Sequence, residues 1–180
     1  MKSLLLTLAL TSLLLPFSLP EGGSLHDAPD GGQIWVGTKT QNAKGPQDIW
    51  VIKTNAIGQE VWSKTYGGSA WDRGADIQPT RDGGYILLGS TSSYGVGNYD
   101  VFLLKLDHEG EVEWQQTYGA FHNDYGFSVV ELANGYLVEG QQQLCGTQND
   151  FNTCIDVPWR LKTDLRGTLT WQERGPQASY

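Results

Sequence analysis

One phrase occurs three times in this chain, and the first two copies lie 52 residues apart. The triplet Asp-Gly-Gly at 30–32 recurs at 82–84, and Trp62 recurs as Trp114. The third copy opens with Asn-Gly-Tyr at 134–136 and later carries a short insertion. A fixed period near 50 residues with strand-like contents is typical of propellers, solenoids and arrays.

The middle copy contains four strand-like segments. The first two are joined by Asp-Gly-Gly, where glycine supplies the positive φ that a tight hairpin needs. The second is a nearly continuous apolar run, which indicates burial on both faces. The four segments are 74–80, 85–91, 99–106 and 111–118.

The other two copies are less even. The first shows only three clear strands, at 34–39, 48–54 and 60–66, because the segment 25–29 is too short and turn-like to serve as a fourth. The third copy shows four strands, at 127–132, 136–142, 157–163 and 168–173.

These eleven strands predict an all-β, propeller-like stack of about three four-stranded antiparallel blades, with repeats at 30–81, 82–133 and 134–180. Closed propellers typically have about four to eight blades, so we expect an incomplete ring. A truncated or degenerate copy of a longer protein is the favoured explanation. A homo-oligomer that completes the ring and an open stack are the alternatives.

The first residues have the features of a secretory signal. Lys2 precedes an apolar run from Leu4 to Leu15, and Pro16 and Pro20 end it. We therefore expect residues 1–23 to be a signal peptide, with an uncleaved N-terminal anchor as the alternative. The run is shorter than the roughly 20 apolar residues of a membrane-spanning helix, so stable membrane insertion is not expected. The predicted location is secreted, periplasmic or extracellular.

The two cysteines of the chain, Cys145 and Cys154, lie in the insertion of the third copy. In an exported protein an even cysteine count favours a disulfide. We expect no metal site here, because no further cysteine or histidine lies nearby in the sequence. The formal net charge of -8, without a cluster of basic residues, argues against nucleic acid as a partner.

The segment DGGYILLGSTSSYGVGNYDVFLLKLDHEGEVEWQQTYGA, residues 82–120, resembles a repeat that is widespread in secreted bacterial and archaeal proteins. The resemblance covers Gly31 to Arg174 and implies extracellular β-propellers, mostly uncharacterised and without an assigned activity. The third copy departs from this repeat at its cysteine-containing insertion and lacks the Thr-Tyr-Gly-Gly ending.

A second spacing, in which a tryptophan follows a glycine by four residues, is similar to the tryptophan-docking motif of quinoprotein propellers. It implies that a tryptophan of one blade locks the next blade. No inward set of polar and metal-binding residues accompanies it, so we expect no cofactor. The residues concerned are Trp62, Trp114 and Trp171.

The repeated acids Asp48, Asp100, Asp72 and Asp124 suggest calcium, but no D-x-D-x-D-G loop is present. We expect these carboxylates to accept backbone N–H bonds at turns and strand ends. No histidine stands in a nucleophile or H-E-x-x-H motif, so no catalytic residue is predicted.

The loops between blades contain aromatic rings beside hydrogen-bonding groups, a combination that binds sugars and peptides. Packing of the rings between blades is the alternative. The candidate ligand surface consists of Trp71, Asp72, Arg73, Phe121, His122, Asp124 and Tyr125.

The sequence therefore predicts a secreted, non-enzymatic repeat module that binds an unidentified protein or carbohydrate. A fragment of an extracellular propeller enzyme, glycan-active or quinoprotein-like and lacking its catalytic part, is the alternative. A degenerate copy without a function of its own is the third interpretation.

Overall fold

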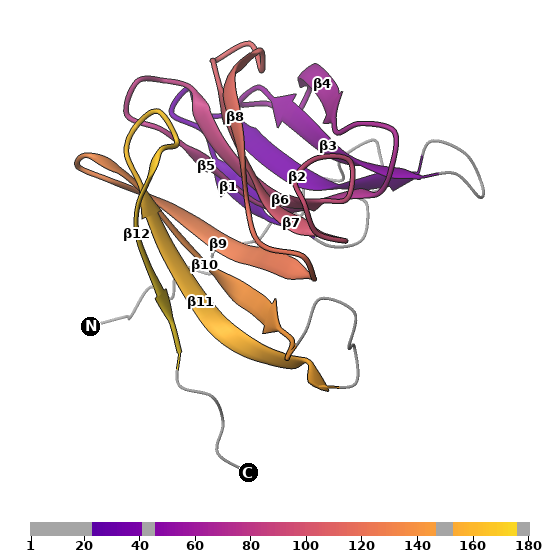
Figure 1. The fold of residues 1–180 in the computed structure, drawn as a ribbon. Coiled ribbons are helices and arrows are strands. Elements are labelled where there is room, and N and C mark those ends of the chain that lie inside the picture. The colour runs from indigo at the N-terminus through magenta and orange to yellow at the C-terminus, as the bar shows by residue number, and fades with distance from the viewer. Residues whose placement is uncertain (1–22, 41–45, 147–152, 176–180) are drawn as a thin grey trace, which may run out of the picture.

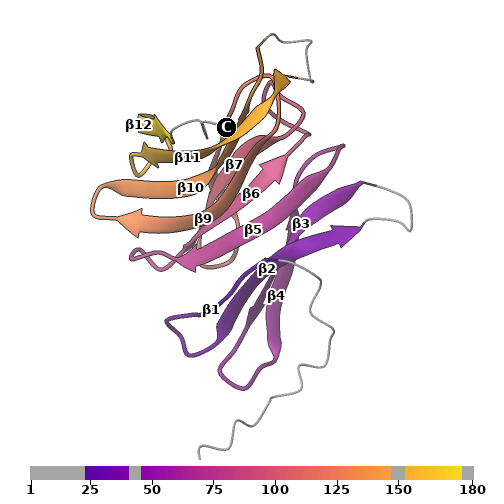
Figure 2. The same cartoon turned by 90° about the horizontal axis from the view of Figure 1, so that it is seen from below.

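A computed structural model describes residues 23–40, 46–146 and 153–175. These residues form three four-stranded antiparallel sheets, each with its strands in chain order. The sheets stack face to face as propeller-like blades, in an arc that does not close into a ring (Figures 1 and 2). The predicted all-β fold class is confirmed. The expected signal peptide at 1–23 lies almost entirely outside the described residues.

The first blade corrects the predicted strand count. Its strands are β1 (Leu25–Asp27), β2 (Gln33–Thr40), β3 (Gln47–Thr54) and β4 (Glu60–Tyr66). The segment set aside as too short does form β1, which pairs with β2 through three residues. The described residues thus hold twelve strands in three complete sheets, rather than eleven strands. The short strand forms because β2 offers a paired edge, which local sequence patterns do not reveal.

The second blade contains β5 (Asp72–Pro79), β6 (Tyr85–Thr91), β7 (Asp100–Leu106) and β8 (Val112–Tyr118). The third contains β9 (Asp124–Leu132), β10 (Gly135–Leu144), β11 (Ile155–Thr163) and β12 (Leu169–Arg174). The Asp-Gly-Gly turns join the first two strands of the first and second blades, as the sequence predicts. Each sheet therefore begins one strand before the repeat boundary drawn at that triplet.

The middle blade is buried on both faces. Along β6, Tyr85 and Leu87 enter the core shared with the first blade, whereas Ile86 and Leu88 enter the core shared with the third. Because successive side chains of a strand point to opposite faces, one apolar run fills both interfaces. All seven residues of β6 are buried, as its apolar run predicts.

The Asp-Gly-Gly turn is tied to a buried lysine of the same blade. Lys105 Nζ lies 3.0 Å from a carboxylate oxygen of Asp82, and Lys53 Nζ lies 2.7 Å from Asp30. Gly83 adopts φ +89°, a conformation that favours glycine. These repeated residues thus close the turn and neutralise a buried charge, which is a structural role.

Asp76, on β5, connects the second blade to the other two. One of its carboxylate oxygens accepts a bond from the Ser24 hydroxyl at 2.7 Å, and the other accepts one from the Val129 backbone N–H at 3.0 Å. Asp76 is buried. A buried carboxylate with these donors fixes the spacing of the blades.

Candidate functional site

The loops at one end of the stack form a continuous surface, which we call the loop face: residues 67–71, 92–99 and 119–123. The backbone N–H of Ser92 donates to the carbonyl of Trp71 at 2.8 Å, and that of Asn98 donates to the carbonyl of His122 at 3.1 Å. The Tyr94 hydroxyl donates to the carbonyl of Gly67 at 3.0 Å. These bonds hold the three loops together.

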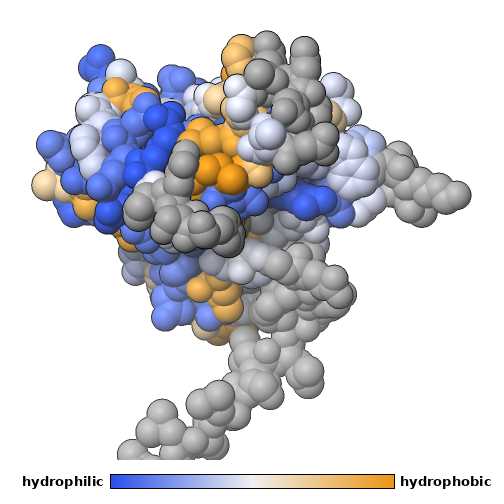
Figure 3. Space-filling view, turned by 60° about the horizontal axis from the view of Figure 1, so that its bottom comes forward, coloured by the Kyte–Doolittle hydropathy of each residue, from blue (hydrophilic) through white to orange (hydrophobic). Residues whose placement is uncertain are grey.

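Four large apolar side chains of the loop face are exposed to solvent. Trp71 is 42% exposed and Phe121 is 57% exposed, and they come from equivalent loops between successive blades. Tyr94 and Val96, in the β6–β7 loop, are also exposed. Figure 3 shows one side of the molecule, where apolar patches interrupt a largely hydrophilic surface.

The candidate ligand surface is narrower than the sequence predicts, because its Asp72, His122 and Asp124 side chains are buried. Asp72 supports the loop that carries Trp71. Its carboxylate accepts bonds from the Gly68 N–H at 2.8 Å and the Ser93 hydroxyl at 2.7 Å, and a third from the Thr91 hydroxyl. The buried acid therefore holds the backbone of the loop that carries the exposed ring.

Asp124 repeats this arrangement one blade later. Its carboxylate accepts a bond from the Ala120 N–H at 2.7 Å. Burial raises the pKa of Asp124, and the nearby Asp100 carboxylate adds to that increase. Asp100 accepts bonds from the N–H groups of Val96 and Gly97, both at 2.9 Å, and burial raises its pKa. These contacts match the structural role predicted for the repeated acids.

Arg73 and Tyr125 lie where the second and third blades meet. The guanidinium carbon of Arg73 lies 5.7 Å from the centre of the Tyr99 ring, and the Tyr99 and Tyr125 rings lie 5.7 Å apart. Arg73 is exposed, whereas Tyr125 is half-buried. Tyr125 therefore packs against Tyr99 and is only partly accessible to a ligand.

Trp62 packs across the boundary between the first and second blades. Its ring centre lies 6.1 Å from that of Tyr85 in an edge-to-face arrangement, and its indole N–H donates to the His108 carbonyl at 3.3 Å. A Cβ atom at Gly110 would lie 2.9 Å from the Trp62 ring. The absence of a side chain at Gly110 therefore makes room for the indole.

Trp114 occupies the same position one blade later, 5.9 Å from the Tyr136 ring and against Gly167. Trp171, the third predicted docking residue, has a different environment. It is 42% exposed on β12, and the Lys162 ammonium lies 5.3 Å from its ring centre. No further blade follows it among the residues that the structure describes.

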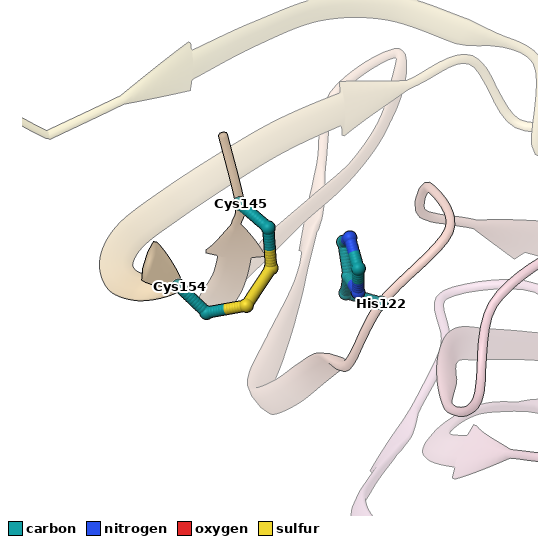
Figure 4. A group of neighbouring side chains, drawn as sticks. All are labelled: His122, Cys145 and Cys154. Carbon is teal, nitrogen blue, oxygen red and sulfur yellow. A yellow bond between two sulfur atoms is a disulfide. The ribbon is translucent and has the colours of Figure 1, made fainter. Parts of the chain in front are cut away.

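The Cys145–Cys154 disulfide predicted from the sequence is present. The structure also places His122 against it, with one ligand atom of each of the three residues within 4.8 Å of the others (Figure 4). The sequence prediction that no histidine lies near the cysteines holds along the chain but not in space, because the β8–β9 loop reaches the end of β10. Within the described ranges, no helix has the length and apolar character needed to span a membrane.

No protein-family model matches the chain, and no curated protein matches it. Among solved structures, it is similar to a mutant form of an apocarotenoid oxygenase from Synechocystis, with a TM-score of 0.51 and 12% sequence identity. The match covers 85% of this chain and 38% of that one, so this chain spans well under half of that protein's length. At this identity, the similarity concerns the fold alone.

Proposed function

We propose that this protein is a secreted, non-enzymatic propeller module that binds a protein or carbohydrate ligand through its loop face. The observation that carries the proposal is the pair of exposed rings, Trp71 and Phe121, on equivalent loops between blades. Aromatic side chains are enriched at recognition surfaces, where they contribute much of the binding energy.

Hydrogen bonds that fix the loop carrying Trp71 favour a role in ligand binding. The Trp71 loop is fixed by Asp72 and by the Ser92 hydroxyl, which accepts a bond from the Trp71 N–H at 2.9 Å. A loop whose backbone is already fixed loses little further freedom when a ligand binds. Exposed polar groups beside the rings, such as Ser69, supply hydrogen bonds for sugar hydroxyls or a peptide backbone.

The proposed export of the chain is supported by the disulfide, because disulfides persist in oxidising compartments. Mass spectrometry of the exported protein tests it. We expect a mature chain that begins near residue 24. Retention of an intact Met1 N-terminus in a cytosolic product would contradict export.

Binding is tested by screening the mature protein against a glycan array and a library of extended peptides. For any ligand found, Trp71→Ala and Phe121→Ala are each expected to weaken binding by about tenfold, a loss typical of a central aromatic contact. Phe127→Ala is the matched control, because Phe127 is 58% exposed on β9, outside the loop face. Equal losses in all three variants would count against the loop face as the binding surface.

A further inference from the structure

Three side chains with metal-binding atoms meet at the loop face, to which His122 belongs. His122 comes from the β8–β9 loop, and Cys145 and Cys154 lie at the two ends of the β10–β11 connection. Their ligand atoms lie within 4.8 Å of one another, and Figure 4 shows the imidazole beside the disulfide. Neither the proposed binding function nor the repeat accounts for this cluster.

The two cysteines are held opposite each other by backbone pairing as well as by the disulfide. Cys145 directly follows Leu144 and Cys154 directly precedes Ile155, and Leu144 pairs with Ile155 in the β10–β11 ladder. The Cα atoms of the two cysteines are 4.0 Å apart. The ladder therefore keeps both sulfur atoms close together when the bond between them is broken.

His122 is also held by contacts that do not involve sulfur. The Asn98 N–H donates to the His122 carbonyl at 3.1 Å. The neighbouring Asn123 is bonded twice to Gln143, once through the Gln143 N–H at 2.9 Å and once between the side-chain amides at 3.1 Å. The His122 loop is thus fixed to β10 at Gln143, which lies two residues before Cys145.

We propose that the reduced chain binds one Zn²⁺ ion through the thiolates of Cys145 and Cys154 and the imidazole of His122. Two thiolates and one imidazole form a donor set that suits zinc, and water supplies the fourth ligand of a tetrahedron. Zinc–sulfur bonds of about 2.3 Å place the two sulfur atoms about 3.8 Å apart. Side-chain rotation at two opposed cysteines reaches this separation.

The oxidation state of the sulfur atoms determines whether the site exists. A dithiol reductant transfers two electrons and two protons to the disulfide, so the S–S bond breaks, two thiols form and the reductant becomes a disulfide. Zn²⁺ then displaces the two thiol protons and accepts a lone pair from His122. In the oxidised chain the sulfur atoms are bonded to each other and carry no thiolate charge, so the chain cannot bind zinc there.

The test uses the mature, tag-free chain in oxidised form and after anaerobic reduction with a phosphine. Co²⁺ serves as a spectroscopic probe, because cobalt bound to thiolates gives a near-ultraviolet charge-transfer band, and Zn²⁺ is added to displace it. We expect one equivalent to bind to the reduced chain and none to the oxidised chain. No charge-transfer band from the reduced chain at micromolar protein would overturn the proposal.

The ligands are tested by substitution. We expect His122→Ala to weaken metal binding by at least about 10- to 100-fold, the range for losing a residue that only supports a ligand. We expect Cys145→Ser with Cys154→Ser to abolish binding. His108→Ala is the control, because His108 is exposed in the β7–β8 turn, at the opposite end of the stack from the loop face. Equal affinity of the His122 and His108 variants would exclude His122 as a ligand.

Folding of the reduced chain is followed by circular dichroism. If reduction alone unfolds the chain, we expect Zn²⁺ to restore the β signal in the wild type but not in the His122 variant. A reduced, unfolded wild type that Zn²⁺ does not restore would also overturn the proposal.

Discussion

The hydroxyl of Tyr66 donates a hydrogen bond to the backbone carbonyl of Gly110, 2.8 Å away in the next blade. Tyr118 makes the same bond to Gly167 one blade later. Burial raises the pKa of both tyrosines well above the ordinary value, with nearby carboxylates adding to the shift, so both hydroxyls stay protonated as donors. Each tyrosine at the end of the repeated phrase thus joins its own blade to the following one.

Removing this hydroxyl tests its contribution to stability. Tyr66→Phe leaves the Gly110 carbonyl buried without that donor, and we expect a loss of about 1–2 kcal/mol in the free energy of unfolding. Tyr94→Phe is the matched control, because its hydroxyl also donates to a backbone carbonyl but the residue is exposed. Its effect should stay within about 0.5 kcal/mol in urea denaturation. Equal losses would contradict the blade-joining role.

The docking tryptophans are compared in the same way. Trp62→Ala removes an indole packed against Tyr85 and Gly110, and we expect a loss of about 2–4 kcal/mol. Trp171→Ala removes an exposed ring, and we expect a change of about 0.5 kcal/mol or less. Thermal unfolding of both variants gives the ranking, and a larger loss at Trp171 would show that its ring docks elsewhere.

The raised pKa of Asp100 should make the stability of the fold depend on pH. Burial raises its pKa in the folded chain, so the folded state holds the proton to higher pH than the unfolded state does. Stability from this group is therefore lost as the pH rises from about 4 through the folded pKa. Asp100→Asn cannot ionise and keeps an oxygen for the Val96 and Gly97 N–H groups. We expect the stability of the wild type relative to this variant to fall between pH 3 and 7.

Asp107 provides the opposite case. Backbone N–H bonds from Glu111 and Glu109 lower its pKa in the folded chain. The stability that it contributes is present above its unfolded pKa and is lost as the pH falls. We expect the free energy of unfolding of the wild type to fall, relative to that of Asp107→Asn, as the pH decreases toward 3. Urea titrations at each pH test both variants, and slopes of the same sign would contradict the assignment.

Removing the disulfide has a calculable cost. Cys145→Ser with Cys154→Ser opens a loop of about ten residues, and we expect a loss of roughly 2–3 kcal/mol from the unfolded chain's added freedom. The Leu144–Ile155 pairing should survive, so the circular dichroism spectrum should keep its β character. Collapse of the spectrum would mean that the bridge is required for the third blade to fold.

The repeat predicted most of the fold because each repeated residue has a local task. The glycine of the Asp-Gly-Gly turn supplies a positive φ, and the apolar run of β6 supplies alternating side chains to two cores. The sequence does not reveal the strand β1, because its order comes from pairing with β2 and from contacts of His26 with Asp76 and Gln78 in the next blade. Neither its length nor its composition indicates a strand.

The candidate site was harder to predict because it depends on contacts between distant segments. In the sequence, Asp72 resembles a surface acid beside Trp71. In the structure it is buried, and its carboxylate accepts bonds from the Thr91 and Ser93 hydroxyls, about 20 residues away in the chain. The proximity of His122 to the cysteines depends on the Asn123–Gln143 bonds, which extend the β9–β10 pairing of the third blade. A single repeat contains none of these relationships.

The loop face as a ligand-binding surface is tested most directly by hydrogen–deuterium exchange with and without a ligand selected from the glycan or peptide screen. We expect slower exchange on binding in residues 67–71 and 119–123, with no change around Trp171. Protection confined to β12 and the 164–168 turn, with the loop face unchanged, would contradict it.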